Sequence, residues 1–260
     1  IQPVPAIIEA PLSDLAEQRR VALVASGPAL DAAMRAGLRL PSIWNAEPGE
    51  ATEARFEELA RAAPVETEIV YGVGGGLAAD AAKYLAWRRG VPLTLIPTAL
   101  SVDAHFTWAS GVRREGCVVY LETGPAATVY VDLDLLAGAP PHIPAAGVCD
   151  LLSIATGLYD WRYAEERGMN PPTQRYLPWA AAAAQAILDG AGAIAEAAGR
   201  GEVLAGRELR RLALELAHAA VVVDAVARHV IERLLARNAP ARPADDQRDL
   251  AFVIERVRLP

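Results

Sequence analysis

The sequence predicts an α/β domain built on a parallel sheet, followed by a domain made of helices. Short β-branched or aliphatic runs alternate with helical patterns through the first half, which is the signature of βαβ units. A segment with three closely spaced prolines, Pro140, Pro141 and Pro144, then leads into long alanine- and leucine-rich helical patterns. We therefore divide the chain into two domains, residues 1–138 and 139–260.

The first domain is expected to alternate strands with helices for most of its length. Aliphatic runs mark the strands, and apolar residues at helical spacing mark the helices. Strands are predicted at 21–25, 42–44, 68–73, 93–96, 117–120 and 128–131, and helices at 27–35, 52–62 and 78–89. Pro97 ends the strand at 93–96, because proline cannot continue a strand ladder.

The second domain is expected to be helical throughout, because no convincing strand pattern follows Asp132. Prolines at 171, 172, 240 and 243 would interrupt the helical patterns. Helices are predicted at 146–166, 177–198, 207–235 and 246–257.

Composition excludes several classes of protein. With 260 residues, of which 53% are hydrophobic, the chain can bury a sizeable core. Its net charge of −7, without a lysine and arginine cluster, argues against a nucleic-acid surface. No apolar stretch is long enough to span a bilayer and the first residues do not resemble a secretory signal, so we expect no membrane partner. The two cysteines, Cys117 and Cys149, argue against a disulfide framework and indicate a reducing cytoplasm.

Three successive glycines between a strand and a helix form the first candidate binding site. Because Gly74, Gly75 and Gly76 lack β-carbons, the main chain can approach a ligand closely, and the helix start offers unpaired N–H groups to a pyrophosphate. Asp80 lies near enough to touch a bound ribose or nicotinamide amide. A tight turn that only lets the helix pack on the sheet is the plain alternative, since the spacing differs from G-x-G-x-x-G.

A second polar segment follows the strand at 93–96. Thr98, Ser101 and Asp103 leave the carboxyl end of this strand, where open α/β sheets bind their ligands. The segment therefore predicts a polar pocket. Ordinary helix capping by a serine or threonine is the alternative.

Four ordered motifs make the chain resemble the polyol dehydrogenase branch of the iron-dependent alcohol dehydrogenase and dehydroquinate synthase superfamily. They are G-G-G-x-x-x-D-x-A-K at 74–83, P-T-x-x-S-x-D at 97–103, A-P-x-x-x-x-x-A-G-x-x-D at 139–150 and T-G-L-Y-D-W at 156–161. Within the superfamily the pattern around Ser153 and Asp160 is most similar to glycerol-1-phosphate dehydrogenases. The resemblance implies a Rossmann-like parallel-sheet domain followed by an all-helical domain, with a helical part shorter than the family's.

The resemblance also implies a role for each matching residue. Asp103 would contact substrate, and Asp150 would bind the catalytic metal and face substrate. The choice between NAD and NADP stays open, because Asn45 and Glu47 after the second strand give an ambiguous ribose signal. The resemblance implies that the nicotinamide dinucleotide contacts Gly75, Gly76, Asp80, Thr98, Ser101 and Thr107, the last where the family has a serine. We expect Gly74, the first glycine of the loop, to contact it as well.

The metal site is where the sequence departs from the family. Two histidine segments, G-S-E-H and H-G, complete the family's site and are absent here. His229 lies at roughly the right distance after Asp150, and Asp245 or Asp246 could supply a third ligand. His218 cannot, because eleven residues on one helix separate it from His229 by about 16 Å. Two alternatives remain. In the first, Asp150 and His229 hold a zinc or iron ion; in the second, His229 is a solvated helix residue and no metal binds.

Three functions are compatible with these residues. The leading hypothesis is an NAD(P)-dependent oxidoreductase acting on a small polyol phosphate, in a homodimer. The second is a dehydroquinate-synthase-like carbocycle-forming lyase, which would need the nicotinamide only in catalytic amount. The third is a catalytically degenerate nucleotide-binding protein, which the missing histidine segments favour.

Overall fold

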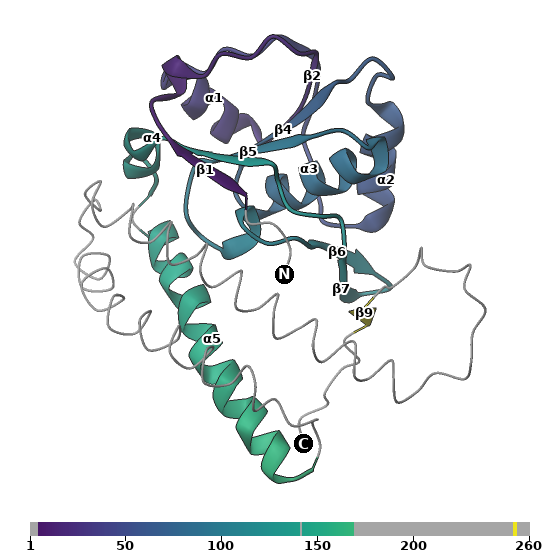
Figure 1. Cartoon of the computed structure of the whole chain (residues 1–260), viewed down its shortest axis with the longest axis vertical. Helices are drawn as coiled ribbons and strands as arrows, with labels where there is room; N and C mark the ends of the chain where they lie inside the picture. Colours follow the sequence, from purple (N-terminus) through teal and green to yellow (C-terminus); the bar gives the residue numbers. More distant parts are fainter. Residues whose placement is uncertain (1–4, 141, 169–251, 254–260) are drawn as a thin grey trace. The chain divides into compact units, whose positions relative to one another are not determined.

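The computed structural model describes residues 5–140, 142–168 and 252–253. Within them, six parallel strands form one sheet in the order β1-β8-β5-β4-β2-β3 (Figure 1). The strands are β1 (Ala6–Glu9), β2 (Val21–Ala25), β3 (Ser42–Ala46), β4 (Ile69–Gly74), β5 (Leu93–Pro97) and β8 (Thr128–Val131). The predicted parallel-sheet α/β domain is confirmed.

Helices cover both faces of this sheet. Figure 1 shows α1 (Gly27–Arg35) on one side, and α2 (Glu53–Ala62) packed on α3 (Gly76–Arg89) on the other. All residues of β2, β4 and β5 are buried, which explains why these strands are continuous apolar runs in the sequence. The edge strand β3 instead alternates between more and less exposed residues.

Helix boundaries follow local chemistry. The Thr52 hydroxyl accepts from the Arg55 N–H and caps the start of α2. Gly90, in the left-handed region with φ 67°, ends α3. Gly72 in β4 lets α3 lie close to the sheet, since a β-carbon there would come within 2.6 Å of Leu95 Cδ2 and 2.7 Å of Ala82 Cβ.

The segment between β5 and β8 differs from the prediction. The predicted strand at 117–120 is β7 (Cys117–Leu121), but it pairs antiparallel with β6 (Ser110–Arg114) and not with the parallel sheet. β6 was not predicted, because Ser-Gly-Val-Arg-Arg contains a single large apolar residue. The helix predicted at 246–257 is wrong at Phe252 and Val253, which form β9 and pair with β7.

The described residues divide into two compact units. One contains the parallel sheet, the β6-β7-β9 sheet and α4 (Leu133–Ala137) through Leu136; the other contains residues 100–103 and α5 (His142–Glu166). The predicted helix at 146–166 is confirmed, with a start four residues earlier. The helices predicted at 177–198 and 207–235 lie outside the described residues. Among the residues described, no helix is long and apolar enough to cross a membrane.

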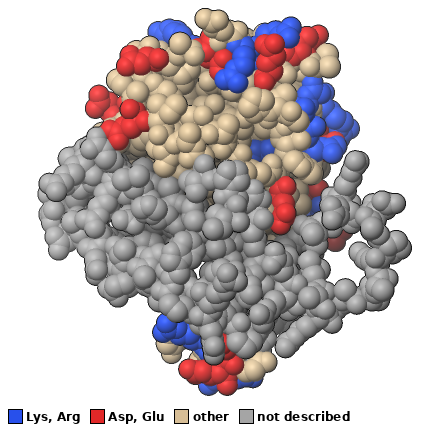
Figure 2. Space-filling model, in the orientation of Figure 1, with Lys and Arg blue, Asp and Glu red and all other residues tan. Residues whose placement is uncertain are grey.

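Charged side chains of both signs share the surface of the α/β unit. At the top of Figure 2, acidic and basic side chains lie next to one another. Exposed ion pairs of this kind contribute little stability each, because water screens them. Three such pairs in this unit are Arg20–Glu68, Arg88–Glu57 and Arg114–Glu53.

Candidate nucleotide-binding site

The glycine loop lies where the strand order of the sheet reverses. From β2 the chain goes first to β3 on one side and then to β4 on the other, and it continues outward through β5 and β8. The connections after β2 and β4 therefore leave toward opposite faces, and such a switch point is where open α/β sheets bind ligands. A β-carbon added at Gly74 would lie 3.6 Å from Ala29 Cβ and 3.8 Å from Ser26 Oγ, so the two connections come close together at this point.

The backbone of this loop requires glycine at its first position. Gly74 has φ 145°, where an L side chain is strained, and a β-carbon there would come within 3.0 Å of Ala78 Cβ. Gly75 is extended (φ −90°, ψ −164°) and is the N-cap of α3, with no side-chain cap. The N–H groups of the first turn of α3 have no helical partner, and the helix dipole makes this end positive. An anionic group is the ligand that such a loop favours.

Across the switch point, the Glu47 carboxylate lies on the start of α1. The Gly27 N–H donates to Glu47 Oε1 at 2.6 Å, and Glu47 comes directly after β3. An acid after the second strand of a dinucleotide-binding unit usually meets a ribose hydroxyl. This contact was not foreseen from the sequence, because it joins residues 20 positions apart.

Asp80 is held by a buried lysine one turn further along α3. Lys83 is fully buried, and its Nζ lies 3.0 Å from Asp80 Oδ1 and donates to Thr107 Oγ1 at 3.1 Å and to the carbonyl of Ala109. The Asp80 side chain is 20% exposed. The hydroxyl of Ser110 donates to the Asp80 carbonyl at 2.8 Å. Predicted residues Asp80 and Thr107 are therefore brought together by Lys83.

The connection after β5 reaches the glycine loop through two hydrogen bonds. The Thr98 N–H donates to the Gly74 carbonyl at 3.2 Å, and His105 Nε2 lies 3.0 Å from the same oxygen. His105 is in the short 3-10 helix η2 (Asp103–His105) and is fully buried. His105 is not among the site residues predicted from the sequence. No signal in the sequence marks it, because its partner is 31 residues away.

In the other unit, Asp103 and Asp150 are neighbours. The Asp103 N–H donates to Asp150 Oδ2 at 2.8 Å, which ties residues 100–103 to α5. Asp150 is half-buried, and this burial raises the pKa of its carboxyl, while the bond from Asp103 lowers it. Ser101 belongs to the same unit and is half-buried. Thr98, Asp80, Thr107 and the three glycines belong to the α/β unit.

A metal site is not complete within the described residues. In that part of the chain no group of three His, Cys, Asp or Glu side chains could hold a metal ion. Asp150 supplies one carboxylate whose Oδ2 already accepts a hydrogen bond, and a catalytic metal usually needs three protein ligands. His229, the second predicted ligand, lies outside the described residues, as do Asp245 and Asp246.

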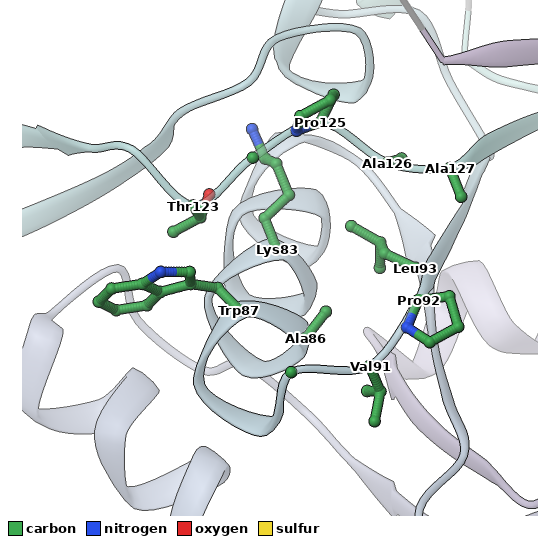
Figure 3. Close-up of a pocket in the computed structure, with 12 residues that line it drawn as sticks. Lys83, Ala86, Trp87, Val91, Pro92, Leu93, Thr123, Pro125, Ala126 and Ala127 are labelled. Carbon is green, nitrogen blue, oxygen red and sulfur yellow. The ribbon is translucent and has the colours of Figure 1, made fainter. Parts of the chain in front are cut away.

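A cavity of about 480 Å³ lies at the other edge of the sheet. Figure 3 shows Lys83 and Trp87 leaving α3 toward the segment that carries Thr123 and Pro125. Its other walls include Pro92 and the residues just before β8. The cavity therefore lies at the amino ends of β5 and β8, whereas ligands of open α/β sheets bind at the carboxyl ends of the strands. We therefore assign the candidate site to the glycine loop.

Comparison with known proteins shows which protein family the first part of the chain matches. Residues 14–140 match the model of the family described as iron-containing alcohol dehydrogenase. The predicted resemblance to that superfamily is confirmed for this part of the chain. The fold agrees, because a probable glycerol dehydrogenase from Sinorhizobium meliloti superposes with a TM-score of 0.66 over 85% of this chain and 66% of that one, at 23% identity. Glycerol dehydrogenase from Schizosaccharomyces pombe gives 0.62 over 85% and 61%, at 18% identity.

Three similar relatives share one name. Proteins named glycerol-1-phosphate dehydrogenase [NAD(P)+] are 35% identical over 155 residues in Thermofilum pendens and 30% identical over 162 residues in Aeropyrum pernix. These matches cover 58% and 60% of this chain, and 45% and 46% of the relatives. The Bacillus subtilis protein of the same name is 31% identical over 105 residues, or 40% of this chain and 27% of its own. The matched regions thus span less than half of the relatives' length.

Proposed function

We propose that this protein is an NAD(P)-dependent oxidoreductase acting on a small polyol phosphate, as a glycerol-1-phosphate dehydrogenase does. The observation that carries the proposal is the glycine loop at the switch point of the sheet, with the partly exposed Asp80 carboxylate held beside it by Lys83. The name of the relatives, glycerol-1-phosphate dehydrogenase [NAD(P)+], supports both the dinucleotide and the phosphorylated polyol.

The residues of this chain divide the work of hydride transfer. The pyrophosphate would bind at Gly74 to Gly76, where unpaired N–H groups and the helix dipole favour an anion. Asp80 accepts hydrogen bonds only, so it suits the ribose hydroxyls or the nicotinamide amide of the dinucleotide. Thr98, Ser101 and Thr107 are proposed as further cofactor contacts, each with a hydroxyl that can donate or accept.

Asp103 and Asp150 are proposed as the substrate-facing pair. The hydrogen bond from the Asp103 N–H fixes one oxygen of Asp150 and leaves its other oxygen for a substrate hydroxyl or a metal. Asp150 and His229 are the residues we propose to hold zinc or iron, which when bound would polarise the substrate oxygen. Burial of Asp150 favours its neutral form unless a cation compensates it.

The assembly and location follow the same proposal. We propose a homodimer, for which the edge strand β1 offers two exposed apolar side chains, Ile7 and Ile8, one on each face of the strand. Light scattering on the purified chain would test the dimer, and a monomer at micromolar concentration would contradict it.

We also propose a cytoplasmic location, which agrees with Cys117 and Cys149 being free thiols. We propose no nucleic-acid or membrane partner. The domain boundary after residue 138 is likewise part of the proposal.

The proposal is tested by replacing a glycine of the loop. Gly75→Val should abolish NADH and NADPH binding, because the branched side chain blocks the approach of the pyrophosphate. The fold should survive, since the extended backbone at Gly75 suits valine. Gly157→Val is the matched control, because Gly157 is exposed on α5 with open space around it. Binding is measured by fluorescence titration.

Two outcomes would count against the proposal. Unchanged affinity for NADH and NADPH in Gly75→Val would show that the loop is not the cofactor site. A wild-type protein that binds neither nucleotide would remove the oxidoreductase assignment itself. With binding established, oxidation of stoichiometric NADH by dihydroxyacetone phosphate separates a dehydrogenase from a lyase that needs the nicotinamide only in catalytic amount.

A further inference from the structure

His105 donates a hydrogen bond to the glycine loop. Its Nε2 lies 3.0 Å from the Gly74 carbonyl oxygen, and a carbonyl can only accept, so the proton of the ring is on Nε2. Within the described part of the chain, the buried Nδ1 has no partner. The ring is neutral near pH 7, because burial, opposed by the bond to Gly74 and aided by the nearby Lys83 ammonium, lowers the pKa of His105 to about 4.

The bond fixes the direction of a peptide plane. The carbonyl of Gly74 and the N–H of Gly75 belong to one planar trans unit, so they point in opposite directions. His105 and the Thr98 N–H both hold this carbonyl toward the connection after β5. The Gly75 N–H is therefore turned away from that connection. Glycine at 74, with φ 145°, has the backbone freedom to let this plane rotate if the carbonyl is released.

We propose that His105 is a positioning residue of the nucleotide site, whose Nε2–H holds the Gly74–Gly75 peptide plane so that the Gly75 N–H faces the bound pyrophosphate. The inference rests on the proposed function, because it assigns the ligand of that N–H. His105 acts through the loop and does not touch the cofactor. Its role is to set the orientation of an amide that would otherwise sample several directions.

Three substitutions at one position test the proposal in the full-length chain. His105→Gln places an amide nitrogen near the position of Nε2, His105→Asn places one near Nδ1, and His105→Leu has no donor. Loss of one hydrogen bond corresponds to about a three- to tenfold rise in Kd. His105→Leu and His105→Asn should show this rise for NADH, and His105→Gln should recover at least half of it on a logarithmic scale.

A stability control separates positioning from general damage. Leu136→Ala removes a buried side chain of α4 and should lower Tm at least as much as His105→Leu, because it leaves a cavity. Its Kd for NADH should equal that of the wild type. If Kd is the same in all three His105 variants, or if His105→Gln binds as weakly as His105→Leu, the positioning role is overturned.

A second readout does not depend on the cofactor. Amide hydrogen exchange of the peptide containing residues 74–78 should be faster in His105→Leu than in His105→Gln, without any nucleotide. If the wild type binds neither NADH nor NADPH, the proposed function fails, and hydrogen exchange alone decides whether His105 holds the loop. Equal exchange in the two variants would then overturn the inference.

Discussion

Lys83 is the buried cation on which the Asp80 carboxylate depends. Lys83→Met keeps the length of the side chain but removes the donors to Asp80, Thr107 and the Ala109 carbonyl. A buried carbonyl left without its donor is unfavourable, so we expect the free energy of unfolding to fall by about 2–3 kcal/mol, measured in urea. The control Arg61→Met, at an exposed side chain 3.8 Å from Glu57, should change it by less than about 0.5 kcal/mol. Equal effects would mean that the Lys83 network is not stabilising.

At the level of single residues, the sequence reveals backbone requirements better than side-chain partners. Gly74 to Gly76 could be singled out because glycine between a strand and a helix has few uses. The role of His105 could not, since its partner is identified only once β4 and β5 are paired. The contact of Lys83 with Ala109 could not be predicted either, because it forms only when β6 packs on α3.

The contact between α3 and the sheet depends on the absence of a side chain at Gly72. In Gly72→Ala, the added methyl would meet Leu95 Cδ2 and Ala82 Cβ at distances below van der Waals contact. We expect overpacking to lower the free energy of unfolding by about 1–3 kcal/mol. Chemical denaturation would measure it, with Gly157→Ala as the control on an exposed helix surface. A Gly72→Ala protein as stable as the wild type would show that α3 can shift outward.

Elements were predictable where burial is continuous or helical spacing is clear. The bounds of β2 and α1 agree with the prediction at both ends, because an apolar run and a proline-started helix leave little choice. β1 was missed because all four of its residues are exposed at the edge of the sheet. The pairing of β7 with β6 was missed because an apolar run shows that a strand exists and not which neighbour it takes.

The stability of the whole α/β unit should depend on pH through Glu17. Its carboxylate accepts from the Arg19 guanidinium at 2.8 Å and from the Tyr71 hydroxyl at 2.8 Å, which ties the segment before β2 to β4. The bond from Arg19, aided by Tyr71, lowers the pKa of Glu17 from 4.5 to about 2, although burial opposes this. The unfolded chain therefore takes up a proton before the folded one does. Stability from this group is complete above pH about 4.5 and is lost as the pH falls toward 2.

Thermal unfolding from pH 7 to pH 2.5 measures this dependence. Glu17→Gln should be less stable than the wild type at pH 7, and the gap between the two should narrow as the pH falls. The exposed Glu66→Gln is the control and should follow the wild type. A gap that stays constant with pH would exclude Glu17 as the titrating group.

At the scale of the molecule, strand order is what the sequence could not supply. The alternation of strands and helices predicts a parallel sheet, but the reversal between β2 and β4 follows from pairing over long distances. That reversal identifies the glycine loop as a ligand-binding position and not merely a turn. The residues proposed for substrate, Asp103 and Asp150, could be matched to a motif, whereas their hydrogen bond needed the folded chain.

The pairing of β1 with β8 also determines when the sheet can be finished during synthesis. The amide of Leu12, just after β1, donates to Asp132, which is 120 residues later in the chain. At about 5–20 residues per second, a ribosome needs roughly 10 s to make the intervening chain. By then β2, β4 and β5 have long been available to pair with one another. The strands from β3 and β2 through β4 and β5 can therefore pair first, and β1, which is translated before every other strand of the sheet, can join only after β8 has emerged.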